Sequence, residues 1–116
     1  MVVNTMGESV DTPTAPHSVY RNDDRNRYEL TAEGLLAICE FNRLTNAVMF
    51  THTEVPEKLE GQGVGSTLVR GALDDVRAQG LEVIPLCPFV AAFIRRHREY
   101  ADLVSPVSRR QVAPNS

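Results

Sequence analysis

The sequence contains little of what several classes of protein depend on. It has no tryptophan and only three tyrosines and four phenylalanines, which is scant material for the aromatic platforms that stack on bases. Its 12 Lys and Arg are outnumbered by 15 Asp and Glu, for a formal net charge of -3. A surplus of cations for a phosphate backbone is therefore missing. We expect a protein that does not bind nucleic acid.

Further absences concern membranes, metals and disulfides. No apolar run approaches the ~18 residues that a membrane-spanning helix requires, and no basic region with an apolar core after it opens the chain as in a secretory signal. The two cysteines, Cys39 and Cys87, form no CxxC pair, and no His, Cys, Asp and Glu cluster has metal-site spacing. We therefore expect a cytoplasmic protein with reduced cysteines, no metal and no membrane contact.

The 116 residues are enough for one domain. Residues 1–17 and 105–116 are rich in Pro, Ser and small side chains, which predicts a disordered tail at each end. The folded unit is then residues 18–104. Because so small a domain has a thin core, a bound ligand or a partner subunit would add to its stability. We expect a monomer or a weak dimer.

The apolar pattern of the folded unit changes its period once. The first half is rich in strand formers, with a link of hairpin length before the last strand. The second half has an amphipathic helix ending before Gly80, then a short apolar strand, then a second helix opening at Pro88. The predicted strands are 19–22, 27–31, 35–41, 47–55 and 81–86. One predicted helix follows the segment 60–66 and runs to about residue 79, and the other runs from 88 to about 100. This order predicts an α/β fold.

A glycine loop separates the strand 47–55 from the first helix. Gly61, Gly63 and Gly65 alternate there, and glycine allows both positive φ and close backbone approach to a ligand. Free N–H groups at the start of a helix lie at the positive end of its dipole, so the loop predicts a phosphate or diphosphate site. A tight turn alone is the alternative. The loop lacks the GK[ST] ending of a P-loop and the GxGxxG spacing of a dinucleotide site.

With this loop, the segments His52–Pro56, Glu60–Ser66 and Val83–Val90, together with Tyr100, resemble the small, single-domain GNAT-type N-acetyltransferases. The resemblance covers essentially all of residues 18–104. It implies the GNAT-type acyl-CoA N-acyltransferase fold, an α/β fold with a mixed, mostly antiparallel, splayed sheet and two main helices. It also implies acetyl-CoA as co-substrate and an amine, on a small molecule or a protein, as acceptor.

Two departures from the family pattern leave an alternative open. Glu60 stands where the superfamily usually has Gln or Arg, and we expect its carboxylate to face solvent, away from a phosphate. Ile94 falls near the place where larger relatives often carry a general-acid tyrosine. A non-catalytic CoA-binding or protein-interaction module is therefore the second hypothesis.

The resemblance also implies which residues bind the cofactor. Backbone N–H groups from Gln62 to Ser66 would hold the diphosphate, and the backbone of Glu54 and Val55 would pair with the pantetheine arm. Cys87 would lie near the thiol end. The residues expected to bind acetyl-CoA are Glu54, Val55, Gln62, Gly63, Val64, Gly65, Ser66, Cys87 and Phe89.

Acetyl transfer to an amine needs a base, donors for the oxyanion and a proton for the leaving thiolate. The N–H of Val55 is the candidate oxyanion donor. His52 is the candidate base, because Glu54 projects from the same strand face and favours its protonated ring; a plain surface histidine is the alternative.

Cys87 precedes Pro88, which predicts a helix N-cap where the dipole favours a thiolate. As predicted catalytic residues, Cys87 is a nucleophile or a proton relay, and His52 acts with Glu54. A buried thiol that only fills space is the alternative for Cys87.

A cationic patch on the last helix completes the candidates. Arg95, Arg96 and Arg98 lie close together in sequence, and they suit the 3′-phosphate of CoA or an acidic partner. A solvated helix face near a C-terminus is the alternative explanation. His97 lies on the apolar stripe of the same helix and is expected to be a core or helix-end histidine.

Overall fold

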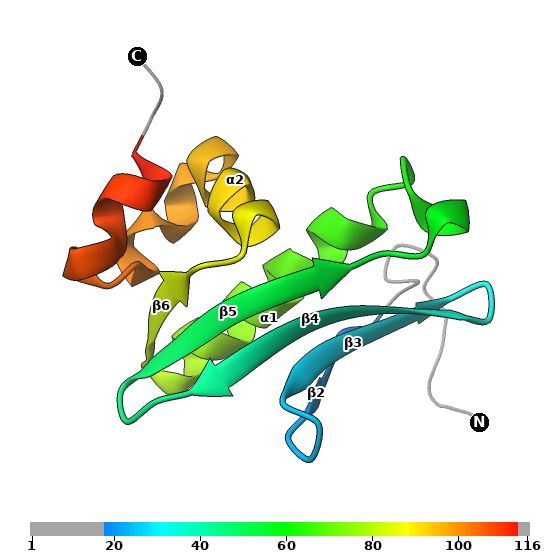
Figure 1. Ribbon diagram of the computed structural model, residues 1–116, viewed down its shortest axis with the longest axis horizontal. Helices are drawn as coiled ribbons and strands as arrows, with labels where there is room; N and C mark the ends of the chain where they lie inside the picture. Colours follow the sequence, from blue (N-terminus) through cyan, green and yellow to red (C-terminus); the bar gives the residue numbers. More distant parts are fainter. Residues whose placement is uncertain (1–17, 114–116) are drawn as a thin grey trace.

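The computed structural model describes residues 18–113. Five strands form one sheet in the order β2-β3-β4-β5-β6 (Figure 1). The first four strands pair with antiparallel neighbours, and β6 pairs parallel with β5. Their bounds are β2 Tyr20–Asn22, β3 Arg27–Ala32, β4 Leu35–Arg43, β5 Ala47–Glu54 and β6 Glu82–Pro85. The predicted mixed, mostly antiparallel α/β architecture is confirmed.

Within residues 18–113, two α-helices and three short 3-10 helices complete the fold. After β5, the turn η2 (Glu57–Leu59) leads into α1 (Val64–Gln79), which crosses one face of the sheet (Figure 1). After β6, α2 (Pro88–Arg96) is followed by η3 (Arg98–Leu103) and η4 (Pro106–Val112). The second helix ends earlier than predicted because His97 leaves the helical region, with φ -123° and ψ 81°. Within residues 18–113, no helix combines the length and apolar character needed to cross a membrane.

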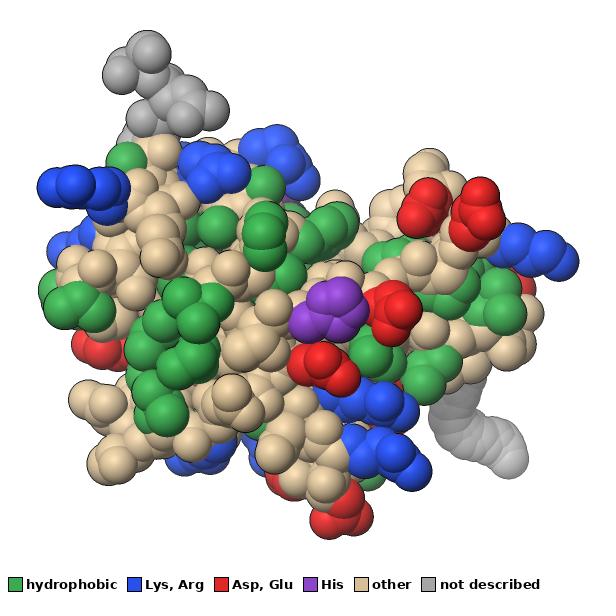
Figure 2. Space-filling model, viewed as in Figure 1, with side chains coloured by type: hydrophobic (Ala, Val, Ile, Leu, Met, Phe, Trp, Pro, Cys, Tyr) green, Lys and Arg blue, Asp and Glu red, His purple; other side chains and the backbone are tan. Residues whose placement is uncertain are grey.

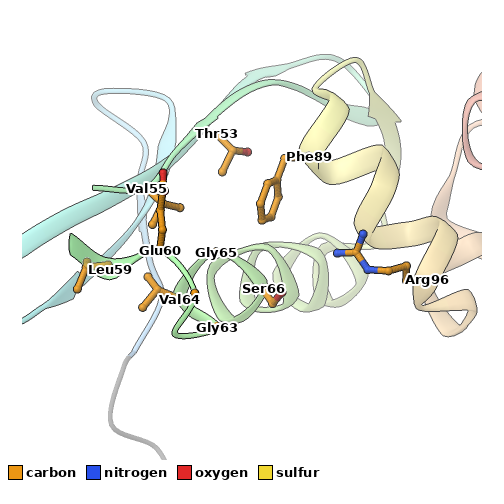
Figure 3. Close-up of a pocket in the computed structure, with 11 residues that line it drawn as sticks. Thr53, Val55, Leu59, Glu60, Gly63, Val64, Gly65, Ser66, Phe89 and Arg96 are labelled. Atoms are coloured by element: carbon orange, nitrogen blue, oxygen red, sulfur yellow. The ribbon is translucent and has the colours of Figure 1, made fainter. Parts of the chain in front are cut away.

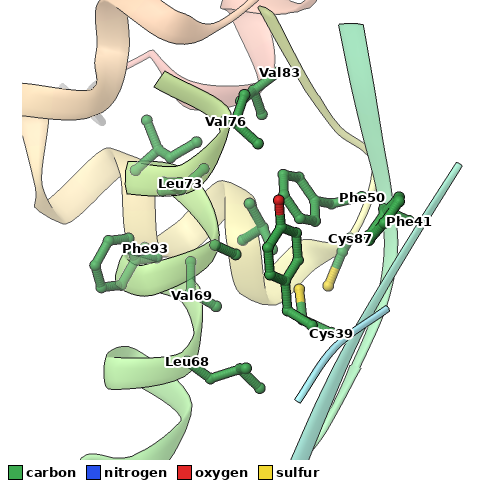
Figure 4. Close-up of a cluster of buried hydrophobic side chains, with 14 of the residues drawn as sticks. Cys39, Phe41, Phe50, Leu68, Val69, Leu73, Val76, Val83, Cys87 and Phe93 are labelled. Atoms are coloured by element: carbon green, nitrogen blue, oxygen red, sulfur yellow. The ribbon is translucent and has the colours of Figure 1, made fainter. Parts of the chain in front are cut away.

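The core lies between α1 and one face of the sheet (Figure 4). Side chains at alternate positions of β3 and β4 face the helix, and they meet its apolar stripe. The fully buried residues of α1 are Leu68, Val69, Ala72, Leu73 and Val76. Phe50 and Phe93 are also fully buried. Truncating any one of these large core side chains to alanine is expected to cost about 2–5 kcal/mol.

The register between β4 and β5 shifts near the end of β5. Glu40 of β4 pairs with His52, whereas the next residue, Phe41, pairs with Phe50, so Thr51 is a bulged residue. Bulges redirect the side chains that follow them. After this bulge Thr53 faces the α1 side of the sheet, because it pairs with the buried Cys39, while His52 and Glu54 face the other side.

The strand β5 extends beyond its parallel neighbour, β6. Pairing between β5 and β6 stops at Phe50 and Pro85, and a last hydrogen bond joins the N–H of Cys87 to the carbonyl of Phe50 at 2.8 Å. From Thr51 onward β5 has no strand partner on this side. The sheet is therefore splayed between β5 and the segment that leads into α2.

The C-terminal segment differs from the disordered tail predicted for residues 105–116. Up to residue 113 it is ordered, with Val112 only 2% exposed and the N–H of Ser105 bonded to the carbonyl of Val83 at 2.9 Å. It covers the free edge of β6, which an isolated strand would leave unpaired. The composition of the segment did not indicate its apolar anchor, Val112. The predicted tail at residues 1–17 and the last residues, 114–116, lie outside the described part.

Candidate functional site

A cleft of about 530 Å³ opens where the sheet splays (Figure 3). It is lined by the end of β5, the turn after η2, the first turn of α1 and both ends of α2. Its lining residues are Thr53, Val55, Leu59, Glu60, Gly61, Gly63, Val64, Gly65, Ser66, Phe89 and Arg96. On the surface, a hollow separates a rim rich in basic side chains at the C-terminal end from a rim with acidic side chains over the η2 turn (Figure 2).

The N-terminus of α1 presents unused hydrogen-bond donors to this cleft. Gly63 is its N-cap, no side chain caps the helix, and the first helical bond runs from Thr67 N–H to the Gly63 carbonyl at 3.0 Å. The N–H groups of Val64, Gly65 and Ser66 donate to no group among residues 18–113. These donors lie at the positive end of a 16-residue helix with no acidic residue in its first turn. The arrangement suits an anion, a phosphate above all.

Two glycines are needed for this geometry, for different reasons. Gly63 has φ +80°, in the left-handed region that other residues rarely adopt. At Gly65, an added Cβ would lie 2.7 Å from Cζ of Phe89 and 3.3 Å from Cγ2 of Val55. The Phe89 ring consequently stands directly over the first turn of α1 (Figure 3). The glycine at position 65 therefore brings two walls of the cleft together.

Most of the predicted cofactor-binding residues meet in the cleft, and three do not. The six that line it are Val55, Gly63, Val64, Gly65, Ser66 and Phe89. The N–H of Gln62 already donates to the carbonyl of Leu59 at 3.4 Å, and its side-chain amide donates to that of Lys58 at 2.9 Å. Glu54 and Cys87 are outside the lining, one on the far face of the sheet and the other in the core.

The N–H of Val55, the candidate oxyanion donor, lies at the end of β5. Among residues 18–113 it donates to no backbone or side-chain group, and it lies just past the last β4–β5 pair, Ile38 with Glu54. It sits at the free margin of the splayed strand. A donor in that place is available to a ligand that lies along β5.

His52 and Glu54 are neighbours, but they face away from the cleft. The His52 Nε2 and Glu54 Oε1 atoms are 4.0 Å apart, and the two side chains are 57% and 70% exposed. Glu40 of β4 lies opposite His52 on the same face. The predicted pair therefore exists, and it opens onto the surface of the sheet opposite α1.

Cys87 occupies the predicted N-cap of α2, before Pro88. Its side chain is only 2% exposed, and its Sγ lies 3.2 Å from Oγ1 of Thr53. The same hydroxyl lies 3.4 Å from Sγ of Cys39, and burial raises the pKa of that thiol to about 12. Thr53 lines the cleft and Cys87 does not. Sequence reasoning missed Thr53; its alternation with Val55 was the available signal, but the bulge decides which face it takes.

The predicted arginine patch is divided by the fold. Arg95 of α2 donates to the carbonyl of Gln111 at 2.6 Å, and Arg98 of η3 donates to that of Val112, so both hold η4 in place. Arg96 instead lines the cleft, on the side opposite Glu60 (Figure 3). Glu60 is exposed as expected, and it also borders the cleft.

The segment η3 is linked to α1 by a polar network that lies away from the cleft lining. The Tyr100 hydroxyl donates to Asp74 at 2.7 Å and accepts from Arg70 at 3.2 Å, and burial is the main cause of its raised pKa. The His97 ring stacks on Phe93, with centroids 4.1 Å apart. Ile94, at the place of the usual general acid, is fully buried. Within residues 18–113, no group of three or more His, Cys, Asp and Glu is placed to hold a metal ion.

Comparisons with known proteins agree with this architecture. A family model described as GCN5-related N-acetyl-transferase matches residues 27–103. The NMR solution structure of a candidate GCN5-like N-acetyltransferase from Staphylococcus aureus is similar, with a TM-score of 0.60 and 23% sequence identity over 76% of this chain and 87% of that chain. At this identity the likeness concerns the fold, and it confirms the predicted GNAT-type fold. A search of curated proteins finds no significant match.

Proposed function

This chain belongs to the GCN5-related N-acetyl-transferase family, and from that premise we propose that it moves an acetyl group from acetyl-CoA to the nitrogen of an amine. One observation carries the proposal. The first turn of α1 offers the N–H groups of residues 64–66 to a cleft at the splay of the sheet, and no group among residues 18–113 occupies them. The two free, buried cysteines fit a cytoplasmic setting.

Successive parts of the cleft suit successive parts of CoA. The diphosphate of CoA suits the N–H groups of residues 64–66, and Arg96 supplies a positive charge for a phosphate oxygen on the α2 side. The pantetheine arm suits the edge of β5 that lacks a strand partner beyond Phe50. In this arrangement the thioester would lie near Thr53 and Val55, and the Val55 N–H would donate to the developing oxyanion.

The acceptor would approach β5 from the opposite face. There His52, held near Glu54, is positioned to accept a proton from an ammonium group before attack. The nitrogen then attacks the carbonyl carbon, the carbon–sulfur bond breaks, and the departing sulfur takes a proton. Cys87 is the proposed source of that proton.

A second candidate is a CoA-binding module without catalysis. It is favoured by the lining of the cleft, in which the only ionisable side chains are Glu60 and Arg96. The place of the usual general acid holds the fully buried Ile94. Such a protein would bind CoA tightly and turn nothing over.

Calorimetric titration of the full chain with CoA and acetyl-CoA tests the shared part of both hypotheses. We expect heat of binding and a raised melting temperature, because the ligand binds the folded state. No heat and no thermal shift would contradict both. Release of free CoA with a panel of small and peptide amines then separates them: turnover supports the transferase, and binding without any acceptor supports the module.

A further inference from the structure

Thr53 lies between the cleft and two buried thiols. Its Oγ1 is 3.2 Å from Sγ of Cys87 and 3.4 Å from Sγ of Cys39. Cys87 is 2% exposed and Cys39 is fully buried, and neither lines the cleft, whereas Thr53 does. Figure 4 shows the two sulfur atoms on the sheet side of the core. The Thr53 side chain therefore lies between these thiols and a ligand bound in the cleft.

The two thiols are not equivalent. Burial raises the pKa of Cys39 to about 12, so that thiol keeps its proton at neutral pH. Cys87 is instead the N-cap of α2, a nine-residue helix with no acidic residue in its first turn. Of the two sulfur atoms that contact Thr53, that of Cys87 lies at the positive end of a helix.

A hydroxyl group has one hydrogen to donate and two lone pairs with which to accept. In the structure the Thr53 hydroxyl donates its hydrogen to Sγ of Cys39, and a lone pair of Oγ1 remains to accept from the Cys87 thiol. Among the cleft-lining residues, Thr53 and Ser66 carry hydroxyl groups. Ser66 is in the first turn of α1, at the anion end, while Thr53 is on β5 beyond Phe50, where the strand edge is free.

We propose that Thr53 is a catalytic residue that passes a proton from the buried Cys87 thiol to the sulfur leaving the acetyl group. The inference rests on the proposed acetyl transfer. As the carbon–sulfur bond breaks, the sulfur departs with the electron pair, and the Thr53 hydroxyl turns from Cys39 to give this sulfur its proton. Oγ1 takes the proton of Cys87, which becomes a thiolate. The attacking amine loses a proton to solvent, and a proton from solvent in the cleft reaches Cys87 again through the Thr53 hydroxyl, so no oxidant or further reactant is needed.

A pair of substitutions isolates the hydroxyl. Thr53→Val keeps the branched shape and removes the O–H, and Thr53→Ser keeps the O–H. We expect Thr53→Val to lower kcat for CoA release by about tenfold or more, as for loss of a proton-transfer group, with CoA affinity unchanged. Thr53→Ser should recover most of the rate. Equal rates for wild type and Thr53→Val, or equal losses in both variants, would overturn the assignment.

A second measurement needs no turnover. The rate of Cys87 alkylation by iodoacetamide is followed against pH on the full chain, with peptide mass spectrometry to separate Cys87 from Cys39. A thiolate that loses a hydrogen-bond donor is less stable, so the Thr53→Val profile should move to higher pH by about one unit. The Thr53→Ser profile should stay near that of wild type. An unchanged Thr53→Val profile would overturn the proposal.

The two proposals fail in different ways. A wild-type chain that shows no binding of CoA overturns the acetyltransferase function and the transfer step with it. A wild-type chain that turns over acetyl-CoA, beside a Thr53→Val variant of equal rate, overturns only the role of Thr53.

Discussion

The first turns of α1 and α2 border the same splay of the sheet but end in different environments. At Gly63 no side chain caps the helix, and the N–H groups that follow face the cleft. At Cys87 the N–H donates to the Phe50 carbonyl and the side chain is buried. Neither first turn has an acidic residue. The positive end of α1 is therefore open to the cleft, whereas that of α2 lies beside a buried thiol.

The largest expected effect comes from filling the space above α1. Gly65→Leu places a side chain where a Cβ alone would be 2.7 Å from the Phe89 ring. We expect CoA affinity to fall by about a hundredfold, roughly 2.7 kcal/mol, measured by calorimetry. Overpacking would lower the unfolding free energy by about 1–3 kcal/mol. An unchanged dissociation constant would contradict the anion site at α1.

The next comparison separates the two cysteines. Cys87→Ala should lower turnover by about tenfold or more and leave CoA affinity near that of wild type. Cys39→Ala should instead lower the unfolding free energy by about 1–2 kcal/mol, with turnover largely kept. Steady-state kinetics and chemical denaturation of both variants check this. If Cys87→Ala keeps the full rate, its thiol only fills space.

A matched pair of glycines tests whether the ends of α1 differ in function. Gly63 and Gly80 cap the same helix with φ +80° and +72°, and a Cβ at either would meet nothing within 4 Å. Alanine at either position should lower the unfolding free energy by about 1 kcal/mol, through backbone strain. Gly63→Ala alone should also weaken CoA binding, by about fivefold. Equal binding by both variants would count against the cleft.

The smallest expected effect concerns the divided arginine patch. Arg96→Gln should weaken CoA binding by about threefold to fivefold, less so at high salt, because it removes a charge at the rim of the cleft. Arg95→Gln is the matched control, since Arg95 bonds to the Gln111 carbonyl instead. Titration with dephospho-CoA, which lacks the 3′-phosphate, shows which phosphate is involved. If Arg96→Gln and wild type bind dephospho-CoA equally well, Arg96 is assigned to the 3′-phosphate. Equal affinities for both variants would remove Arg96 from the site.

Local patterns in the sequence were enough for the elements and for the glycine loop. The apolar stripe of α1, its cap at Gly80 and the cap at Cys87 depend on neighbours a few residues away, and the structure has them where the sequence predicts. The GNAT-type fold followed from the resemblance of the glycine loop and the segment 83–90, taken together with the short chain, to that family. These features are set by backbone conformation close to the residues themselves.

What the sequence did not reveal depends on contacts between distant segments. The spacing of His52 and Glu54 predicts a shared face, but the bulge at Thr51 determines that this face is turned from the cleft. The division between Arg95 and Arg96 depends on a carbonyl in η4, a segment predicted to be disordered. The contact of Thr53 with both thiols needs three elements to meet, so no local pattern signals it.

The anchoring of η4 links the end of the chain to the cleft. Arg95 of α2 and Arg98 of η3 hold this segment beside the helix that Cys87 caps and that ends at Arg96. Val104 adds a parallel bridge to β6 beside them. Clipping by a protease ahead of Pro106 would remove these contacts and loosen α2, which borders the cleft.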